Sequence, residues 1–201
     1  MIGTKEVFAA IQAADAVFEE GAVGAGRGMS CHGLKGGIGT SSREVQIGEQ
    51  TFTIGVLVLT NHGSLADLTI DGKNIGAEID QQIQANAPDK GSCIMIVATD
   101  LPVTDRQLKR IIKRCSVGLA RVGSFIGHGS GEIMIGFSTA NRIPKNGEFC
   151  EMTYIHENEI NKAFRAVAEA TEEAVIRSML KAEAVTGNNG NKRRSLSEFY
   201  K

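Results

Sequence analysis

The sequence predicts a single α/β layered domain, and three observations support this prediction. Strand-like runs that are apolar at most positions occur at 51–60 and 92–100. Segments with apolar residues at helical spacing flank these runs, and the longest of them lies near 158–183. The 201 residues suffice for one domain with a sizeable core and contain no internal repeat. Strands buried between amphipathic helices form a layered α/β domain.

The first part of the chain predicts a helix, a loop and a hairpin. Thr4 can cap a helix of about 15 residues, whose apolar positions recur at helical spacing and give it one apolar face. Eight of the 23 residues in 21–43 are glycine, which predicts a loop with special backbone conformations. The runs 44–47 and 51–60 lie on either side of Gly48-Glu49-Gln50 and predict a β-hairpin.

The second part predicts two buried strands around a capped helix. Residues 64–91 are mixed and polar, and they end in the segment 84–91, which has the composition of an exposed linker. The run 92–100 predicts a strand buried on both faces. Thr104-Asp-Arg-Gln107 fits a capping box that opens a helix, and 127–139 predicts a glycine turn that leads into another buried strand.

Composition argues against several classes of function. The net charge is −1, so charge gives no reason to expect a nucleic-acid partner. No apolar run approaches the ~18 residues of a membrane span, and the start MIGTKEVFAAIQ lacks the layout of a signal peptide. The sequence therefore predicts a cytoplasmic protein without a membrane partner.

The cysteines and histidines show no spacing typical of a metal site. The four cysteines lie far apart without a CxxC pair, which argues against a zinc site and a disulfide framework. The four histidines show no ligand spacing, and their predicted place is in loops or on the surface. We therefore expect no metal and no cofactor. These residues are Cys31, Cys93, Cys115, Cys150, His32, His62, His128 and His156.

Two further motifs resemble known sites but lack an essential part. GLKGGIGTS (33–41) is similar to a phosphate-binding loop, but Thr40 stands where the phosphate-binding lysine is needed, and no apolar strand precedes the loop. GHGSG (127–131) is similar to a nucleophile elbow, but His128 stands where that motif requires glycine.

The pair Gly91-Ser92 is a stronger candidate than these two motifs. A glycine at the end of a polar linker meets a serine at the start of a buried strand. If the bond between them is cut, Ser92 carries a hydroxyl and a free α-amine. An α-amine has a pKa of about 7.7–8.0, so a useful neutral fraction exists at physiological pH. Such an amine can act as general base for its own hydroxyl. From these residues alone, a plain turn before a strand remains an alternative.

Several motifs in order resemble the DmpA-like family of L-aminopeptidase/D-esterase and β-peptidyl aminopeptidase enzymes. The matching segments are GRGMSCHGLKGGIGTSSR, GVLVLTNHG, GSCIMIVATDLP, QLKRIIKRCSVGLARVGS, GHGSGEIMIGFSTAN and ATEEAVIRSML. The match begins near residue 20 and continues to the tail. Because the motifs are separate and occur in the right order, the resemblance is specific.

The resemblance implies a four-layer α/β/β/α sandwich of the N-terminal-nucleophile type, and a precursor that splits itself between Gly91 and Ser92. Ser92 matches the nucleophile, and Asn61 matches the asparagine that holds the oxyanion. Ser130 and Glu132 match the serine and glutamate that position and tune the N-terminal serine. The glycines of the loop 33–39 are then expected close to the active site, and they are Gly36, Gly37 and Gly39.

The expected activity is hydrolysis of the N-terminal residue of a short peptide, amide or ester through an acyl-enzyme, by a homo-oligomer. Family members usually carry a further N-terminal stretch, which the segment 1–201 lacks, so this single domain is expected to be partial. Two alternatives stay open. One is acyl transfer similar to that of ornithine acetyltransferases, although those enzymes use threonine where Ser92 stands. The other is a non-catalytic remnant that only binds or assembles.

Overall fold

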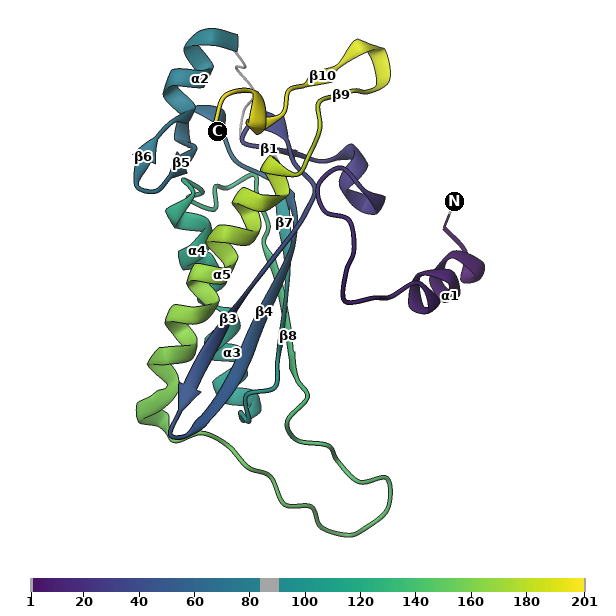
Figure 1. Ribbon diagram of the computed structural model, residues 1–201, viewed down its shortest axis with the longest axis vertical. Helices are drawn as coiled ribbons and strands as arrows, with labels where there is room; N and C mark the ends of the chain where they lie inside the picture. Colours follow the sequence, from purple (N-terminus) through teal and green to yellow (C-terminus); the bar gives the residue numbers. More distant parts are fainter. Residues whose placement is uncertain (1, 84–90, 201) are drawn as a thin grey trace.

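A four-stranded sheet forms the centre of the molecule (Figure 1). The computed structural model describes residues 2–83 and 91–200. The strand order is β3-β4-β7-β8, in which β7 pairs antiparallel with β4 and parallel with β8. The bounds are β3 Ile38–Ile47, β4 Gln50–Asn61, β7 Ser92–Thr99 and β8 Ile133–Ser138.

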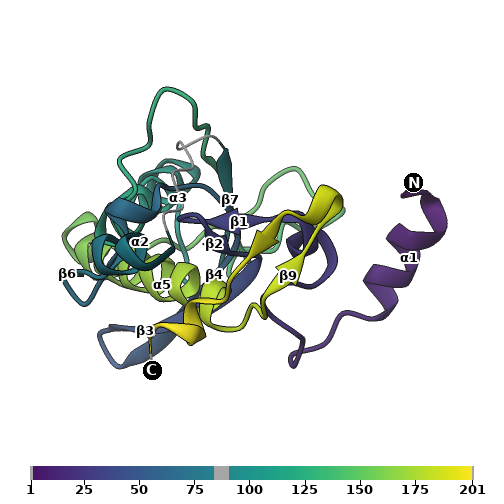
Figure 2. The ribbon, with the colours of Figure 1, turned by 90° about the horizontal axis from the view of Figure 1, so that it is seen from above.

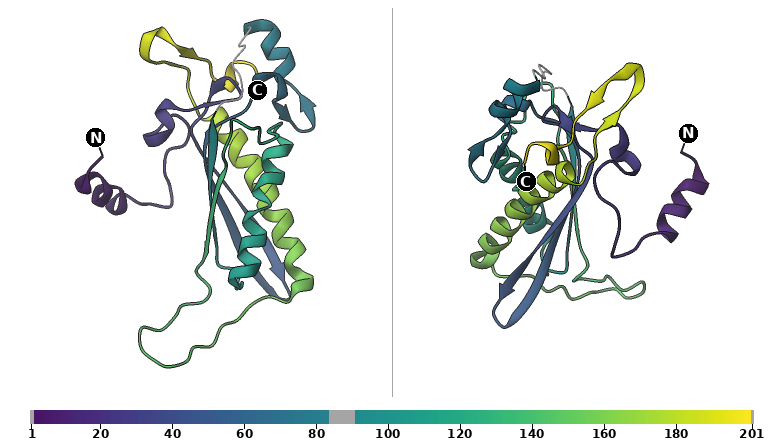
Figure 3. Two further views of the ribbon diagram at one scale, coloured as in Figure 1. Left: turned by 180° about the vertical axis from the view of Figure 1, so that it is seen from behind. Right: turned by 45° about the horizontal axis from the view of Figure 1, so that its top comes forward.

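Helices cover one face of this sheet. They are α3 (Asp105–Ile112), α4 (Cys115–Arg121) and α5 (Ile160–Leu180). Figures 2 and 3 agree that these helices lie on the same side of the sheet, whereas α1 (Thr4–Gln12) stands apart on the other side. Because β7 and β8 are parallel, the chain must return from the end of β7 to the start of β8 through a long connection. Helices α3 and α4 lie in this connection.

Most of the remaining elements are short and gather at the end of the sheet where β4 ends and β7 begins (Figure 1), whereas the 3₁₀ helix Glu157–Glu159 leads into the start of α5 at the opposite end. Two-residue strand pairs are β1 (Ser30–Cys31) with β2 (Leu34–Lys35), β5 (Thr69–Ile70) with β6 (Lys73–Asn74), and β9 (Val185–Thr186) with β10 (Lys192–Arg193). The helix α2 covers Gly76–Ile83, and short 3₁₀ helices cover Gly24–Gly28, Leu65–Asp67, Glu157–Glu159, Asn188–Gly190 and Leu196–Glu198.

The core lies between the sheet and α5, where small residues allow close approach. The buried residues of α5 include Ala163, Ala170 and Ala174. A Cβ atom at Gly39 of β3 would stand 2.0 Å from the carbonyl oxygen of Ala174, so only glycine fits there. Dense packing between strand and helix therefore depends on glycine in the strand and alanine in the helix.

The other face of the sheet carries exposed apolar side chains. Ile133 and Ile135 are each 53% exposed and Phe137 is 50% exposed, and all three point away from α5. The prediction that 127–139 contains a fully buried strand is therefore wrong for the described residues, because helices cover only one face. The prediction for 92–100 is wrong for the same reason, since burial alternates along β7 and Ile96 is 37% exposed.

The structure confirms the hairpin and the capping box and corrects several bounds. The hairpin strands β3 and β4 are longer than predicted, so Gly39 lies in a strand and not in the loop 21–43. The Thr104 hydroxyl accepts a hydrogen bond from the Gln107 N–H and caps α3. The first helix has 9 residues and none of them is buried. The linker predicted at 84–91 lies outside the described residues except for Gly91.

Helix α2 was not predicted. Its only buried residues are Gly76 and Ile79, so its sequence shows almost no apolar stripe. None of the helices in the described part of the chain combines the length and the apolar character that a bilayer crossing needs.

Candidate active site

Ser92 stands at the first position of β7, where the sheet begins. Its backbone pairs with Asn61, the last residue of β4. The Ser92 hydroxyl donates a hydrogen bond of 2.7 Å to the carbonyl oxygen of Gly91 and accepts one of 3.2 Å from the Gly131 N–H. These two bonds hold the hydroxyl beside the carbonyl group of the peptide bond that precedes it.

Gly91 is held by its neighbours on both sides. Its backbone bridges to Ser130, and its N–H donates to the carbonyl oxygen of Gly129 at 3.4 Å. A Cβ atom at position 91 would stand 1.9 Å from the carbonyl oxygen of Asn61. Glycine is therefore required at position 91, directly before the predicted nucleophile Ser92.

A single hydrogen bond from the Ser30 N–H fixes the orientation of the Asn61 side-chain amide. The Ser30 N–H donates to its Oδ1 at 3.1 Å, and a backbone N–H requires an acceptor. The Nδ2 donor must then point the other way. It lies 3.2 Å from the point where a Cβ of Gly91 would stand. The structure thus brings an N–H donor beside the peptide group that precedes Ser92.

Ser130 and Glu132 form a pair next to Gly91. The Ser130 hydroxyl donates to Glu132 Oε1 at 2.5 Å, and both side chains are half-buried. The second oxygen, Oε2, is buried and has no hydrogen-bond partner among the described residues. A carboxylate oxygen in that state is an acceptor available to a cationic or N–H donor. All four predicted catalytic positions are therefore near Gly91 and its strand neighbours.

The three predicted loop glycines have different surroundings. Gly36 is packed against Cys31 and Thr60, the residue before Asn61. Gly37 donates its N–H to the Thr60 hydroxyl at 3.1 Å, whereas Gly39 is packed against α5. Gly36 and Gly37 therefore support the end of β4, and Gly39 supports the core.

Lys35 was not singled out from the sequence, yet it organises the glycine loop. It is 2% exposed, and its ammonium donates to the carbonyl oxygens of Gly26, Met29 and Gly36 at 2.8, 2.6 and 2.5 Å. Burial lowers the pKa of Lys35 from its usual value. The ammonium gives these inward-facing carbonyl groups a buried cationic partner.

Two buried side chains beside the site keep uncharged forms. Burial, with a smaller effect of His32, lowers the pKa of His62 to about 3. Burial raises the pKa of the Cys93 thiol well above its usual value, and the charges of Cys31 and Glu132 act in the same direction. Cys93 is thus held as a thiol and not as the nucleophilic thiolate.

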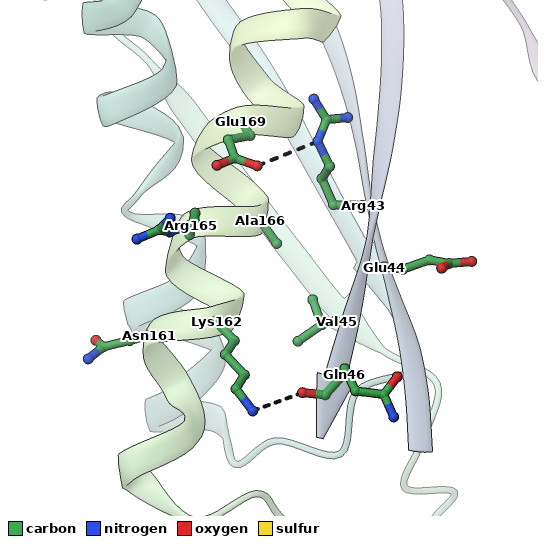
Figure 4. A pocket seen from close by; sticks show the side chains of 9 residues that line it. All are labelled: Arg43, Glu44, Val45, Gln46, Asn161, Lys162, Arg165, Ala166 and Glu169. Atoms are coloured by element: carbon green, nitrogen blue, oxygen red, sulfur yellow. Dashed lines mark hydrogen bonds and ion pairs between the residues drawn. The ribbon is translucent and has the colours of Figure 1, made fainter. Parts of the chain in front are cut away.

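Two pockets differ in their relation to these residues. Figure 4 shows a pocket of about 430 Å³ between β3 and α5, where Arg43 pairs with Glu169 and Lys162 donates to the Gln46 carbonyl oxygen. None of the predicted catalytic residues lines it. A second pocket of about 340 Å³ reaches Ser30, whose N–H orients Asn61. The other lining residues of this second pocket include Arg27, Lys35, Asn188, Asn191 and Arg193.

Comparison with solved structures defines the class of fold. The chain superposes with a TM-score of 0.87 on the L-aminopeptidase D-Ala-esterase/amidase from Ochrobactrum anthropi, described as a variant of the Ntn hydrolase fold; the two are 36% identical, and the match covers 96% of this chain and 54% of that one. A protein from Pyrococcus horikoshii OT3 gives a TM-score of 0.88 at 48% identity, over 96% of this chain and 53% of that one. The predicted α/β fold class is therefore confirmed, and the described residues supply one sheet layer and one helix layer of it.

The family follows from the sequence comparisons. The chain belongs to peptidase family S58, which matches residues 1–193. It is 41% identical to the β-peptidyl aminopeptidase BapA from Sphingosinicella xenopeptidilytica, over 92% of this chain and 50% of the relative. The predicted family resemblance is confirmed. The chain spans about half the length of the curated relatives it matches.

Proposed function

We propose that this chain carries the nucleophile of a self-processing aminopeptidase, with Ser92 as an N-terminal nucleophile. The observation that carries the proposal is the position of the Ser92 hydroxyl, 2.7 Å from the Gly91 carbonyl oxygen and supported by the Gly131 N–H. In maturation, the hydroxyl oxygen attacks the Gly91 carbonyl carbon and the C–N bond to Ser92 breaks. Water then hydrolyses the resulting ester, which leaves a carboxylate on Gly91 and an α-amine on Ser92.

The new α-amine supplies the base for the peptidase reaction. Its pKa of about 7.7–8.0 allows it to take the proton of its own hydroxyl near neutral pH. The hydroxyl oxygen attacks the carbonyl carbon of the substrate's first residue, the leaving amine departs with a proton, and water resolves the acyl-enzyme. The Oε2 atom of Glu132, which lacks a partner among the described residues, is suited to hold the protonated amine, with Ser130 fixing the carboxylate.

Asn61 is suited to stabilise the oxyanion in both reactions. The Ser30 N–H fixes its Oδ1, so its Nδ2 needs no rearrangement to donate beside Gly91. Pre-oriented donors of this kind stabilise charge that develops on the carbonyl oxygen. The proposal therefore assigns the same donor, Asn61 Nδ2, to self-cleavage and to substrate hydrolysis.

The proposed substrate is a short peptide, amide or ester. The pocket of about 340 Å³ beside Ser30 has the size of a small-ligand site, and Arg27 and Arg193 give it a positive lining suited to a carboxylate. The relatives named for β-peptidyl aminopeptidase activity support an N-terminal residue as the point of cleavage. A cytoplasmic location and a homo-oligomeric state belong to the same proposal.

The apolar face of the sheet supports the four-layer arrangement within this proposal. Ile133, Ile135 and Phe137 form an exposed row on β8. A second sheet packed on this face would remove the row from water, as in other sandwiches of two sheets.

Intact mass and N-terminal sequencing test the proposal. We expect the purified protein to yield pieces 1–91 and 92–201, Ser92→Ala to remain one chain, and Ser92→Cys to retain splitting because it keeps a nucleophile. A wild-type chain that stays whole while it hydrolyses peptide amides would refute the mechanism. Preferential transfer of the acyl group to an added amine would favour the acyltransferase alternative instead. A whole, inactive and oligomeric protein would favour the non-catalytic remnant.

A further inference from the structure

Three potential metal ligands that are separated in the sequence meet in the buried region beside Asn61. They are Cys31 at the end of β1, His32 in the following turn, and His62 directly after β4. Their ligand atoms all lie within 4.8 Å of one another, and all three residues are buried. The cluster contains none of the proposed catalytic residues. His32 and His62 lie in loops, as the sequence predicts, but neither lies on the surface, since they are 0% and 3% exposed.

The backbone brings adjacent residues to the same side. His32 has a φ of 46°, in the left-handed region that a residue with a Cβ seldom adopts. This turn allows the side chains of Cys31 and His32 to converge, although neighbours in an extended strand point to opposite faces. The His32 N–H donates to the His62 carbonyl oxygen at 2.7 Å and ties the two segments together. The spacing of these residues in the sequence does not predict the cluster. Its geometry depends on a strained turn at His32 and on a contact between residues 30 positions apart.

The hydrogen bonds of the imidazole rings favour metal binding. His32 Nδ1 lies 2.9 Å from the Ser64 carbonyl oxygen, which only accepts, so Nδ1 carries the proton and Nε2 carries the lone pair. Metal-binding histidines are held in this way by an outer partner. His62 is 3% exposed, and neither of its ring nitrogens has a hydrogen-bond partner among the described residues. A buried polar group in that state requires an explanation, and a bound ion is one of them.

We propose that Cys31, His32 and His62 form a binding site for a thiophilic divalent cation of the zinc class. One thiolate and two imidazoles are the donors that Zn²⁺ prefers, and three protein ligands leave a fourth position for water or another small ligand. The inference does not depend on the proposed hydrolase activity, because its readout is metal binding.

Charge near the site both helps and limits binding. The Lys35 ammonium is close enough to interact with the charge of Cys31, and such a cation favours the thiolate that a metal requires. The same ammonium repels a divalent ion, which limits the affinity. Bound metal would also connect β1, which provides the Ser30 N–H, to the residue after Asn61.

The test uses Co²⁺ and Zn²⁺ as chlorides with the full chain, after treatment with a chelator. We expect one Co²⁺ per chain, the visible bands of a four-coordinate ion, a thiolate-to-metal band in the near ultraviolet, and displacement by Zn²⁺. Metal binding to the folded state also raises the melting temperature. A wild-type protein that binds no Co²⁺, or binds it without the thiolate band, would overturn the proposal, and this result does not depend on any variant folding.

Substitutions then assign the ligands. We expect Cys31→Ser to lose the thiolate band, and His62→Phe to weaken Co²⁺ binding by more than the roughly 10–100-fold that loss of an outer-shell partner costs. The matched controls are Cys150→Ser and His156→Gln, at exposed residues outside the cluster, and they should bind as the wild type does. Wild-type binding by folded Cys31→Ser, with circular dichroism as the check on folding, would refute the assignment.

Discussion

A methyl group at position 91 should block maturation more than it disturbs the rest of the fold. In Gly91→Ala, the new Cβ would stand 1.9 Å from the carbonyl oxygen of Asn61, about 1.1 Å short of the 3.0 Å that real Cβ contacts respect. The obstacle is backbone, so it cannot rotate away. The strand ends must separate, which displaces the Gly91 carbonyl relative to the Ser92 hydroxyl and the Asn61 amide. A misplacement of about 1 Å can cost roughly 10²-fold in rate.

The assay follows the uncut chain by intact mass over time after synthesis. We expect Gly91→Ala to split at least about 100-fold more slowly than the wild type. The matched control is Gly131→Ala, at the residue whose N–H donates to Ser92, because a Cβ there meets only the Ser92 hydroxyl at an ordinary 3.7 Å. Wild-type splitting by Gly91→Ala, in protein with a wild-type melting temperature, would show that the close contact between β4 and Gly91 does not control the reaction.

Two other predictions follow from the same region. Asn61→Ala removes the Nδ2 donor, so the turnover number measured on already split protein should fall ~10²–10³-fold, and an unchanged turnover number would exclude this oxyanion donor. Burial lowers the pKa of His62 to about 3, whereas the unfolded chain binds this proton below about pH 6.5. The free energy of unfolding of the metal-free protein is therefore highest above pH 6.5 and should fall by on the order of 5 kcal/mol between pH 6.5 and 3 through this group. Denaturant titrations of wild type and His62→Phe at several pH values measure it, and equal slopes in the two proteins would contradict the assignment.

Local patterns in the sequence predicted much of the central sheet and its helices, because these elements depend on interactions between residues that are close in the chain. The β3–β4 hairpin, the capping box at Thr104 and the long helix α5 each depend on residues near one another in the chain. The exposed row on β8 was not predictable in this way, since an apolar strand has the same sequence whether one or two layers cover it. Short α2 was missed because its burial depends on one isoleucine, Ile79.

The candidate site was predictable only in part. The motif match placed Ser92, Asn61, Ser130 and Glu132 together, and the structure shows the register that makes them neighbours. The role of Lys35 was not predictable, because its partners are backbone carbonyl groups, which every residue type carries. Contacts between side chains and backbone depend on how the loop closes, and a residue pattern does not record this.

Lys35 gives the glycine loop a counter-charge that belongs to the chain itself. Loops that turn several carbonyl oxygens inward often depend on an ion from solution, and such loops open when the ion is removed. Here the positive group is covalently attached to the chain and converges on three of those oxygens. Dilution or chelation cannot remove it, so these three carbonyl oxygens have a cationic partner that does not depend on the salt in solution.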